Sequence, residues 1–376
     1  MPIPEGTFDQ LDLWRKLLKA GPSGIDLLGI DLIWSGTLES DLIDLAPYSA
    51  TEISSLEPQL LPFYTVNGKL VAIPYQVNVG ALEYRSDLLL KYGYDHPPRT
   101  WEELESMAKR IQSGERAKGS KDFWGYVWQG VSAEALTCNA LEWQIAEGGG
   151  RIIESDRTIS VNNPAAIRAW ERAKRWIGSI SPPSVVAYRE IDSMNVFGSG
   201  KAAFNRVWLG TTITRAGRSP RVYWRNLNPI VETGFTSIPG GPGGSAGTLG
   251  GSGLSVSLYS AHRSEAIEFV RFLVRAQIQS NENRKSASPG RFEIANLPSV
   301  SDLHSEFQKP IQHGMDLVSR PSVEAGARYK QVSADYAAAV HAVLTGQKRA
   351  PEAAADLEKQ LVAITGFRTG PPETRK

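Results

Sequence analysis

Polar side chains interrupt an apolar stretch of the chain at residues 70–85. The stretch reads LVAIPYQVNVGALEYR, so that Tyr75, Gln76 and Asn78 stand between two hydrophobic runs. A buried amide or hydroxyl without a hydrogen-bond partner costs free energy, so such groups are rare inside an ordinary buried strand. The pattern therefore predicts a strand that lines the floor of a polar pocket. An edge strand whose polar face meets water is the alternative.

Catalytic and metal-binding motifs are not recognisable elsewhere in the sequence. The five histidines share no metal-ligand spacing, and the single cysteine, Cys138, has no partner for an internal disulfide. The segment GSGK at residues 198–201 is close to a phosphate-binding loop, but Asn195 replaces its first glycine and Ala202 the hydroxyl residue that holds magnesium. A carboxylate pair of the glycosidase type stays open, because spacing alone does not exclude it. We expect no metal and no other cofactor.

Length and charge restrict the class of protein further. A chain of 376 residues indicates two or three domains, and a net charge of +1 gives no long-range attraction to nucleic acid or to an anionic membrane. The basic segment RAGRSPRVYWR (residues 215–225) could contact a polyanion, but the near-neutral charge of the whole chain favours an exposed loop. Ten tryptophans and twelve tyrosines are the unusual feature, and such rings suit a cleft for a flat, polar ligand.

Hydrophobic periodicity and capping residues predict the elements that position these groups. Amphipathic helices are expected over residues 8–21, 100–112, 162–178, 260–277, 329–346 and 351–365. Thr100 and Asn163 are expected to cap the second and third of these helices, with Pro164 at the first helical position of the third. Buried strands are expected over residues 25–34 and 123–130, and a tight hairpin at residues 67–69. The segment at residues 240–253, with eight glycines, is expected to be a linker or a backbone that approaches a ligand closely. The alternation of strands and helices predicts an α/β architecture with a parallel sheet.

A series of motifs in a fixed order resembles one family. IDLIWSGTLESDLIDLAPY is followed by the segment from GKLVAIPYQVNVGALEYR to TWEELESMAKRI, by WGYVWQGVSAEALTCNALEWQIAEGGGRI, by FGSGKAAFNRVW, by TLGGSGLSVSLYSAHRSEAIEFVRFL and by RPSVEAGARYKQVSADYAAAVHAVLTG. In this order they resemble the extracellular solute-binding proteins (family 1) of ABC sugar importers, and above all the trehalose/maltose-binding group. The likeness extends over residues 8–361.

The resemblance implies an α/β fold of the two-lobed, type II periplasmic-binding-protein kind, with an interlobe cleft and crossing hinge strands. Residues 1–82 and 249–295 are expected to form the first lobe, and residues 83–248 and 296–376 the second. Residues 70–85 would line the cleft and then cross to the second lobe. In the family a signal sequence and a first strand–helix unit precede the segment that matches TFDQLDLW, and neither is expected in this chain.

Ligand-binding roles carry over from the family to single positions. The expected ligand-binding residues are Gln76, Asn78, Trp208, Gly250, Gly251, Arg320, Glu134 and Trp34. Trp208 would stack on a sugar ring, the two glycines would bring backbone close to it, and Arg320 would bind its hydroxyls. Trp34 or Asp31 would contribute from the end of the first-lobe strand, and burial in the core is the equal alternative for both. The chain departs from the family at Asn78, where a carboxylate is usual, and at Ser252, where an aromatic ring commonly follows the glycine pair.

The function expected from this resemblance is that of a non-enzymatic receptor. It would capture a di- or oligosaccharide related to trehalose, maltose or sucrose and deliver it to the permease subunits of an ABC transporter. The expected protein is a monomer in the periplasm or tethered outside the cytoplasmic membrane, with no nucleic-acid partner. A carbohydrate-active enzyme and a truncated remnant that binds nothing are the alternatives.

Overall fold

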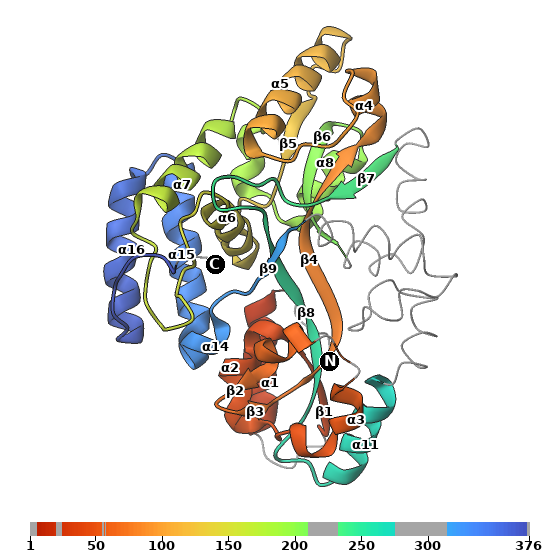
Figure 1. Cartoon of the computed structure of the whole chain (residues 1–376), viewed down its shortest axis with the longest axis vertical. Helices are drawn as coiled ribbons and strands as arrows, with labels where there is room; N and C mark the ends of the chain where they lie inside the picture. Colours follow the sequence, from red (N-terminus) through yellow and green to blue (C-terminus); the bar gives the residue numbers. More distant parts are fainter. Residues whose placement is uncertain are drawn as a thin grey trace. The chain divides into compact units, whose positions relative to one another are not determined.

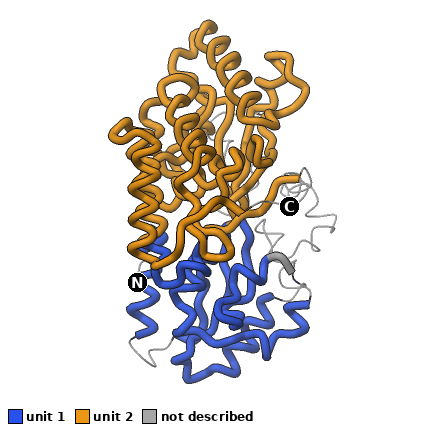
Figure 2. Tube along the Cα trace, turned by 60° about the vertical axis from the view of Figure 1, so that its left-hand side comes forward, with its two compact units in different colours: residues 1–78, 250–304, 321–330 blue, residues 79–249, 305–320, 331–376 orange. Residues whose placement is uncertain are grey.

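The chain folds into two compact units (Figure 2). The computed structural model describes residues 6–19, 25–54, 56, 58–209, 232–274 and 314–373. Unit 1 comprises Met1–Asn78, Gly250–His304 and Pro321–Lys330, and unit 2 comprises Val79–Leu249, Ser305–Arg320 and Gln331–Lys376. The segment Pro321–Lys330, which the sequence analysis places in the second lobe, therefore belongs to unit 1. The basic segment at residues 215–225 lies outside the described residues.

Unit 1 is built from short helices around strands that continue into unit 2. Its elements (Figure 1) are α1 (Thr7–Lys19), β1 (Leu27–Asp31), η1 (Leu32–Trp34), α2 (Ser35–Leu38), η2 (Glu39–Asp41), η3 (Ala46–Tyr48), α3 (Ala50–Ile53), η4 (Pro58–Tyr64), β2 (Thr65–Val66), β3 (Lys69–Leu70), α11 (Arg263–Val274), α14 (Ser322–Ala325) and η7 (Gly326–Arg328). β1 pairs antiparallel with β8 (Ala246–Val256), from Leu27 opposite Val256 to Asp31 opposite Ser252.

Two local predictions for unit 1 can be compared with the structure. The hairpin is confirmed: Asn67 and Gly68, both with positive φ (50° and 81°), connect β2 to β3. The strand expected over residues 25–34 is shorter, because Asp31 ends it. The Oδ1 atom of Asp31 accepts a hydrogen bond from the Ile33 amide at 3.2 Å and so caps the 3₁₀ turn that follows.

Unit 2 holds the longer elements. They are α4 (Ser86–Lys91), α5 (Trp101–Ala117), β5 (Trp124–Val127), α6 (Glu134–Ala146), α7 (Pro164–Trp176), η5 (Pro183–Ala187), α8 (Glu190–Gly198), β6 (Ala202–Leu209), β7 (Thr233–Thr236), β9 (Asp316–Val318), α15 (Tyr329–Leu344) and α16 (Ala350–Thr365). β4 (Ile73–Arg85) and β8 run through both units, since the boundaries between the units fall after Asn78 and after Leu249. Across the described ranges, no helix is long and apolar enough to cross a membrane.

The prediction of a parallel sheet is wrong for most of the described strand pairs. β5 and β6 are parallel, as are β8 and β9, but β6 and β7 both pair antiparallel with β4, and β1 pairs antiparallel with β8. β4 runs from unit 1 into unit 2 and lies antiparallel to β6 and β7. β8 runs from unit 2 into unit 1 and lies antiparallel to β1. Alternation of strands and helices along the chain does not reveal this, because it leaves the direction of a shared strand open.

The helices predicted in unit 2 from their caps are confirmed. Thr100 accepts a hydrogen bond from the Glu103 amide at 3.2 Å at the start of α5. Asn163 accepts hydrogen bonds from two amides, each at 3.0 Å, at the start of α7, where Pro164 occupies the first helical position. Both are the side-chain caps that leave fewer backbone donors unpaired at a helix N-terminus. α15 and α16 are also confirmed, with the turn between them at Gly346.

The glycine-rich segment is not a linker, because most of it forms the buried strand β8. Glycines are needed there for close packing against β4. A Cβ atom on Gly247 would lie 2.6 Å from the Gly80 carbonyl oxygen, and one on Gly251 would lie 2.1 Å from the Gln76 carbonyl oxygen. Gly251 also has a positive φ of 125°, which side-chain-bearing residues rarely adopt.

Tryptophans form much of the core of unit 2. Trp176 packs against Trp101 and Trp143 with ring centroids 5.1 Å and 5.5 Å apart, and Trp143 packs edge-on against Trp128 at 5.0 Å. Among the described residues, the buried tryptophans are Trp34 in unit 1 and, in unit 2, Trp101, Trp128, Trp143, Trp170 and Trp176. The unusual tryptophan content, which the sequence analysis attributes to a ligand cleft, therefore comes mainly from packing.

Candidate functional site

In unit 1, β4 presents its amides on one face. Gln76 and Asn78 are two residues apart in the strand, so both side chains project from the same side, and both are partly exposed. Val77, between them, is buried. Gln76 Oε1 accepts a hydrogen bond from Ser252 Oγ of β8 at 3.4 Å. The residue that stands where the family commonly has an aromatic ring thus contacts one of the expected ligand-binding amides.

The two glycines expected at the ligand lie at the first positions of β8 in unit 1. The packing of Gly251 on the Gln76 backbone gives a structural reason for glycine at this place. Trp34 follows β1, in the turn η1, with 3% of its surface exposed. Its indole Nε1 has no hydrogen-bond partner among the described residues. Trp101, Trp143 and Trp170 also have an indole N–H without a hydrogen-bond partner among the described residues, so this feature does not by itself mark Trp34 as a ligand contact.

In unit 2, Trp208 is the one residue of β6 that is not fully buried. The Arg206 guanidinium carbon lies 4.2 Å from the centroid of its ring, and that of Arg320 lies 5.9 Å away. Both distances are within the range of cation–π attraction. A partly exposed indole with cationic groups around it is suited to stack on a ligand that has an apolar face.

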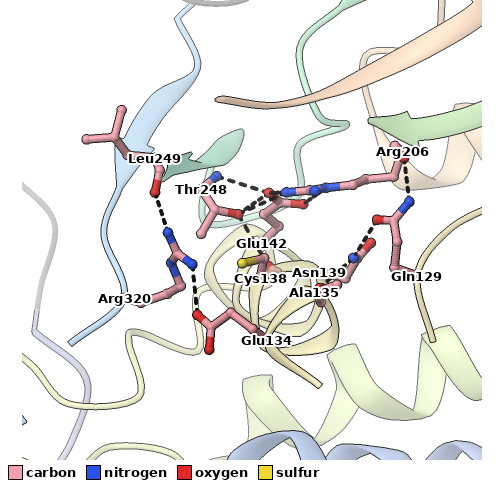
Figure 3. A network of polar contacts seen from close by, with 10 residues as sticks. All are labelled: Gln129, Glu134, Ala135, Cys138, Asn139, Glu142, Arg206, Thr248, Leu249 and Arg320. Carbon is pink, nitrogen blue, oxygen red and sulfur yellow. Dashed lines mark hydrogen bonds and ion pairs between the residues drawn. The ribbon is translucent and has the colours of Figure 1, made fainter. Parts of the chain in front are cut away.

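Arg320, whose guanidinium carbon lies 5.9 Å from the centroid of this ring, forms an ion pair with Glu134. The ion pair is drawn in Figure 3. Arg320 Nη1 donates to Glu134 Oε1 at 2.8 Å, and Nη2 donates to the Leu249 carbonyl oxygen at 3.0 Å. Glu134 also accepts a hydrogen bond from Ser333 of α15. Glu134 is the first residue of α6. Both terminal nitrogens of Arg320, expected to bind ligand hydroxyls, therefore donate to protein acceptors in this structure.

The comparisons with known proteins decide the family. The family model for the bacterial extracellular solute-binding protein matches residues 11–280. The chain belongs to this family. A relative from Deinococcus radiodurans, named "Probable ABC transporter-binding protein", is 37% identical over 375 residues, which cover 97% of this chain and 86% of the relative.

Solved structures agree with this solute-binding fold. A maltose-bound MalE3 of T. maritima has a TM-score of 0.82 and 29% identity, with 97% of this chain and 90% of the other covered. An ABC transporter solute-binding protein of Thermotoga lettingae, in complex with α-D-tagatose, has a TM-score of 0.80 and 20% identity, with 96% and 90% covered. The second likeness concerns the fold alone. The predicted two-lobed α/β fold is confirmed.

The sequence analysis of this solute-binding protein missed a buried ion pair, Arg206 with Glu142. Arg206 Nη2 and Nε donate to Glu142 Oε1 and Oε2 at 2.6 Å and 3.1 Å, and the two side chains are 0% and 1% exposed. Burial lowers the pKa of Arg206, but the charge and hydrogen bond of Glu142 outweigh this effect and leave the pKa raised. The charged Glu142 within the mainly apolar segment ALEWQIA was the sequence signal that could have indicated this pair.

Helix α6 places the acidic residues of this network. All of its residues after Glu134 are buried, so the helix lies within the core of unit 2. Glu134, Cys138 and Glu142 are spaced four residues apart and share one face. That face meets Arg320, Thr248 and Arg206 (Figure 3). The helix thus holds both carboxylates that pair with the arginines beside Trp208.

Proposed function

We propose that this solute-binding protein is the substrate-binding receptor of an ABC importer and captures a di- or oligosaccharide such as maltose, trehalose or sucrose. The name of the relative from Deinococcus radiodurans supports the transporter assignment. The maltose-bound structure at 29% identity supports the ligand class. The proposed place of action is outside the cytoplasmic membrane, where a monomer delivers its sugar to the permease subunits.

The partly exposed indole of Trp208 is the main structural support for a sugar as the ligand. A sugar ring has a face of C–H bonds and a rim of hydroxyl groups. An indole plane suits the face, whereas amides, carboxylates and guanidinium groups suit the rim, because every buried hydroxyl needs a partner. Trp208 is partly exposed at the end of a strand that is otherwise buried, and its ring lies against a fixed guanidinium.

Seven further residues are proposed as contacts of the sugar. In unit 1 they are the side chains of Gln76 and Asn78, the backbone of Gly250 and Gly251, and Trp34. In unit 2 they are Glu134 and Arg320. Asn78 is neutral where the family usually has a carboxylate, so its hydrogen bonds to hydroxyls are expected to be roughly half as strong as charge-assisted ones. We propose binding without chemical conversion, and without metal or cofactor.

Thermal unfolding and calorimetry with maltose, trehalose and sucrose test this function. A sugar at about 100 times its dissociation constant stabilises a folded protein by about 2.7 kcal/mol, so the binding sugar should raise the melting temperature. Trp208→Ala should weaken its binding by about 1–3 kcal/mol, because a stacking plane is lost.

Trp124→Ala is the matched control for this substitution. Trp124 is also a partly exposed indole of unit 2, and the Arg116 guanidinium carbon lies 4.3 Å from its ring centroid. Its removal should leave sugar binding unchanged. Equal losses in the two variants, or no shift with any saccharide, would contradict the proposal. Hydrolysis of the bound sugar would favour a carbohydrate-active enzyme instead.

A further inference from the structure

The guanidinium group of Arg206 supports the ring proposed to stack on the sugar. Arg206 and Trp208 are two residues apart in β6, so both side chains project from the same face of the strand. The guanidinium carbon lies 4.2 Å from the ring centroid, which is close for a cation–π contact. The position of the indole therefore depends on where the guanidinium is held.

Glu142 and Thr248 hold that guanidinium. Glu142 bonds it through both carboxylate oxygens, and Glu142 Oε1 also accepts from the Thr248 amide at 3.0 Å and from the Thr248 hydroxyl. Arg206 Nη2 reaches Thr248 Oγ1 at 3.2 Å as well (Figure 3). A planar guanidinium fixed at two edges cannot rotate about its side chain, whereas an ammonium group in the same place could.

The pair also packs against the two strands that pass into unit 1. A Cβ atom on Gly80 of β4 would lie 2.0 Å from Glu142 Oε1 and 2.5 Å from Arg206 Nη2, so only glycine leaves room for the pair there. On β4, Gly80 is the second residue that belongs to unit 2. On β8, Thr248 is the last but one residue that belongs to unit 2. The ion pair thus contacts both strands close to the points where the chain changes unit.

Stability alone gives a weak reason for this pair. Arg206 is fully buried, and its Nη1 has no hydrogen-bond partner among the described residues. Buried ion pairs are often no more stabilising than apolar side chains of the same size, and an unpaired buried donor adds a further cost. A role beyond stability is therefore reasonable.

We propose that Arg206 is a positioning residue for sugar binding: held by Glu142 and Thr248, it fixes the indole of Trp208 relative to Gly80 of β4 and Thr248 of β8. This rests on the proposed function, in which Trp208 stacks on the sugar. Arg206 itself does not touch the ligand. Its contribution acts through the orientation and mobility of the Trp208 ring.

Arg206→Lys tests the proposal, because it keeps the charge and removes the planar, two-edged contact. Affinity for the sugar that stabilises the unchanged protein should fall about 5- to 30-fold, as expected for loss of a buried cation–π support. Quenching of Trp208 emission by acrylamide should increase, measured as the difference between each protein and its Trp208→Phe counterpart. Arg116→Lys, beside Trp124, is the matched control and should leave both values unchanged.

Loss of stability is separated from loss of positioning by a second pair of variants. Glu142→Gln keeps a hydrogen-bonding side chain but releases the guanidinium, and it should change affinity and Trp208 quenching in the same direction as Arg206→Lys. Tyr336→Phe removes a buried hydrogen bond elsewhere in unit 2, from the Tyr336 hydroxyl to Gln144 at 2.9 Å. It should lower the melting temperature without changing the sugar affinity or the Trp208 quenching. If Arg206→Lys does not fold, Glu142→Gln decides the question.

The outcomes distinguish this inference from the proposed function. If Trp208→Ala binds the sugar as well as the unchanged protein, the proposed function fails at this residue. If Trp208→Ala loses binding while Glu142→Gln and any folded Arg206→Lys keep full affinity and unchanged quenching, the positioning role of Arg206 is overturned and the ion pair is structural only.

Discussion

Two arginine–tryptophan pairs in unit 2 have the same contact and different surroundings. The guanidinium carbon of Arg206 lies 4.2 Å from the Trp208 ring centroid, and that of Arg116 lies 4.3 Å from that of Trp124. Arg116 is partly exposed and donates from Nε to the Phe123 carbonyl oxygen at 2.8 Å. Arg206 is fully buried and bound to a buried carboxylate.

The difference shows what fixes a cation over an aromatic ring. A partly exposed guanidinium is solvated, so its attraction to the ring is weak and its removal lowers the free energy of unfolding only slightly. A buried guanidinium needs its counter-ion, and the counter-ion needs it, because neither can be left alone in the core. The Arg206 pair is therefore rigid and costly to disturb, whereas the Arg116 pair serves as a reference for the ring contact alone.

The largest effect is expected from Arg206→Ala. It removes the cation that pairs with Glu142 in the core, which should lower the free energy of unfolding by about 3–5 kcal/mol. Arg116→Ala should cost less than about 1 kcal/mol, because its cation–π contact is partly exposed. Urea unfolding of both variants measures the difference. Adding Glu142→Ala to Arg206→Ala should restore part of the loss; strictly additive losses would show that the two side chains do not interact.

A second buried acid, Glu83, extends the comparison to a carboxyl group without a cation. Glu83 is 0% exposed on β4, and Asn205 of β6 donates to it at 3.3 Å. Burial raises the pKa of Glu83 from 4.5 to about 8, and the hydrogen bond from Asn205 lowers it only in part. The folded protein therefore keeps a proton that the unfolded chain loses above pH 4.5.

The free energy of unfolding should therefore decrease as the pH rises from 4.5 to about 8, by up to roughly 1.4 kcal/mol per pH unit from this group. The side chain introduced by Glu83→Gln is neutral at every pH, so the free energy of unfolding of this variant should not show the decrease that Glu83 causes. The free energy of unfolding of Glu83→Gln minus that of the unchanged protein should therefore increase with pH. Urea unfolding at pH 5, 6, 7 and 8 measures it. Tyr336→Phe should shift the curve by a constant. Parallel curves for Glu83→Gln and the unchanged protein would refute a protonated Glu83.

Local chemistry made much of the fold predictable. The Asn67–Gly68 turn, the Thr100 and Asn163 caps and the helix periodicities depend on residues close in sequence, and all are confirmed. Strand direction and the fate of the glycine-rich segment depend on packing between distant segments. Gly247 and Gly251 are needed because β8 lies against β4, and no local pattern of glycines tells such close packing from a linker.

Only part of the candidate site was predictable from the sequence. Trp208 was found from the order of motifs, and its partial exposure on β6 agrees with a binding role that stays a proposal. Arg206 stands two residues earlier in the same motif and was passed over. Its importance comes from Glu142 and Thr248, which are 64 and 42 residues away along the chain. Only the folded chain brings these partners together.

The smallest expected effect uses Cys138, the single thiol of the chain, as a reporter of the Arg206 pair. Cys138 lies one turn before Glu142 on α6, and its carbonyl oxygen is 3.5 Å from Thr248 Oγ1. Burial raises the pKa of its thiol to about 12, so in the folded protein a thiol reagent reacts with it only after local opening. Glu142→Gln should speed this labelling several-fold under native conditions, because it loosens the contacts that close α6 against β8. Arg116→Lys should leave the rate unchanged, since the contacts of this guanidinium are with the Trp124 ring and the Phe123 carbonyl oxygen. An equal rate in all three proteins would mean that α6 opens independently of the ion pair, and the contrast between the two arginines would then be limited to stability.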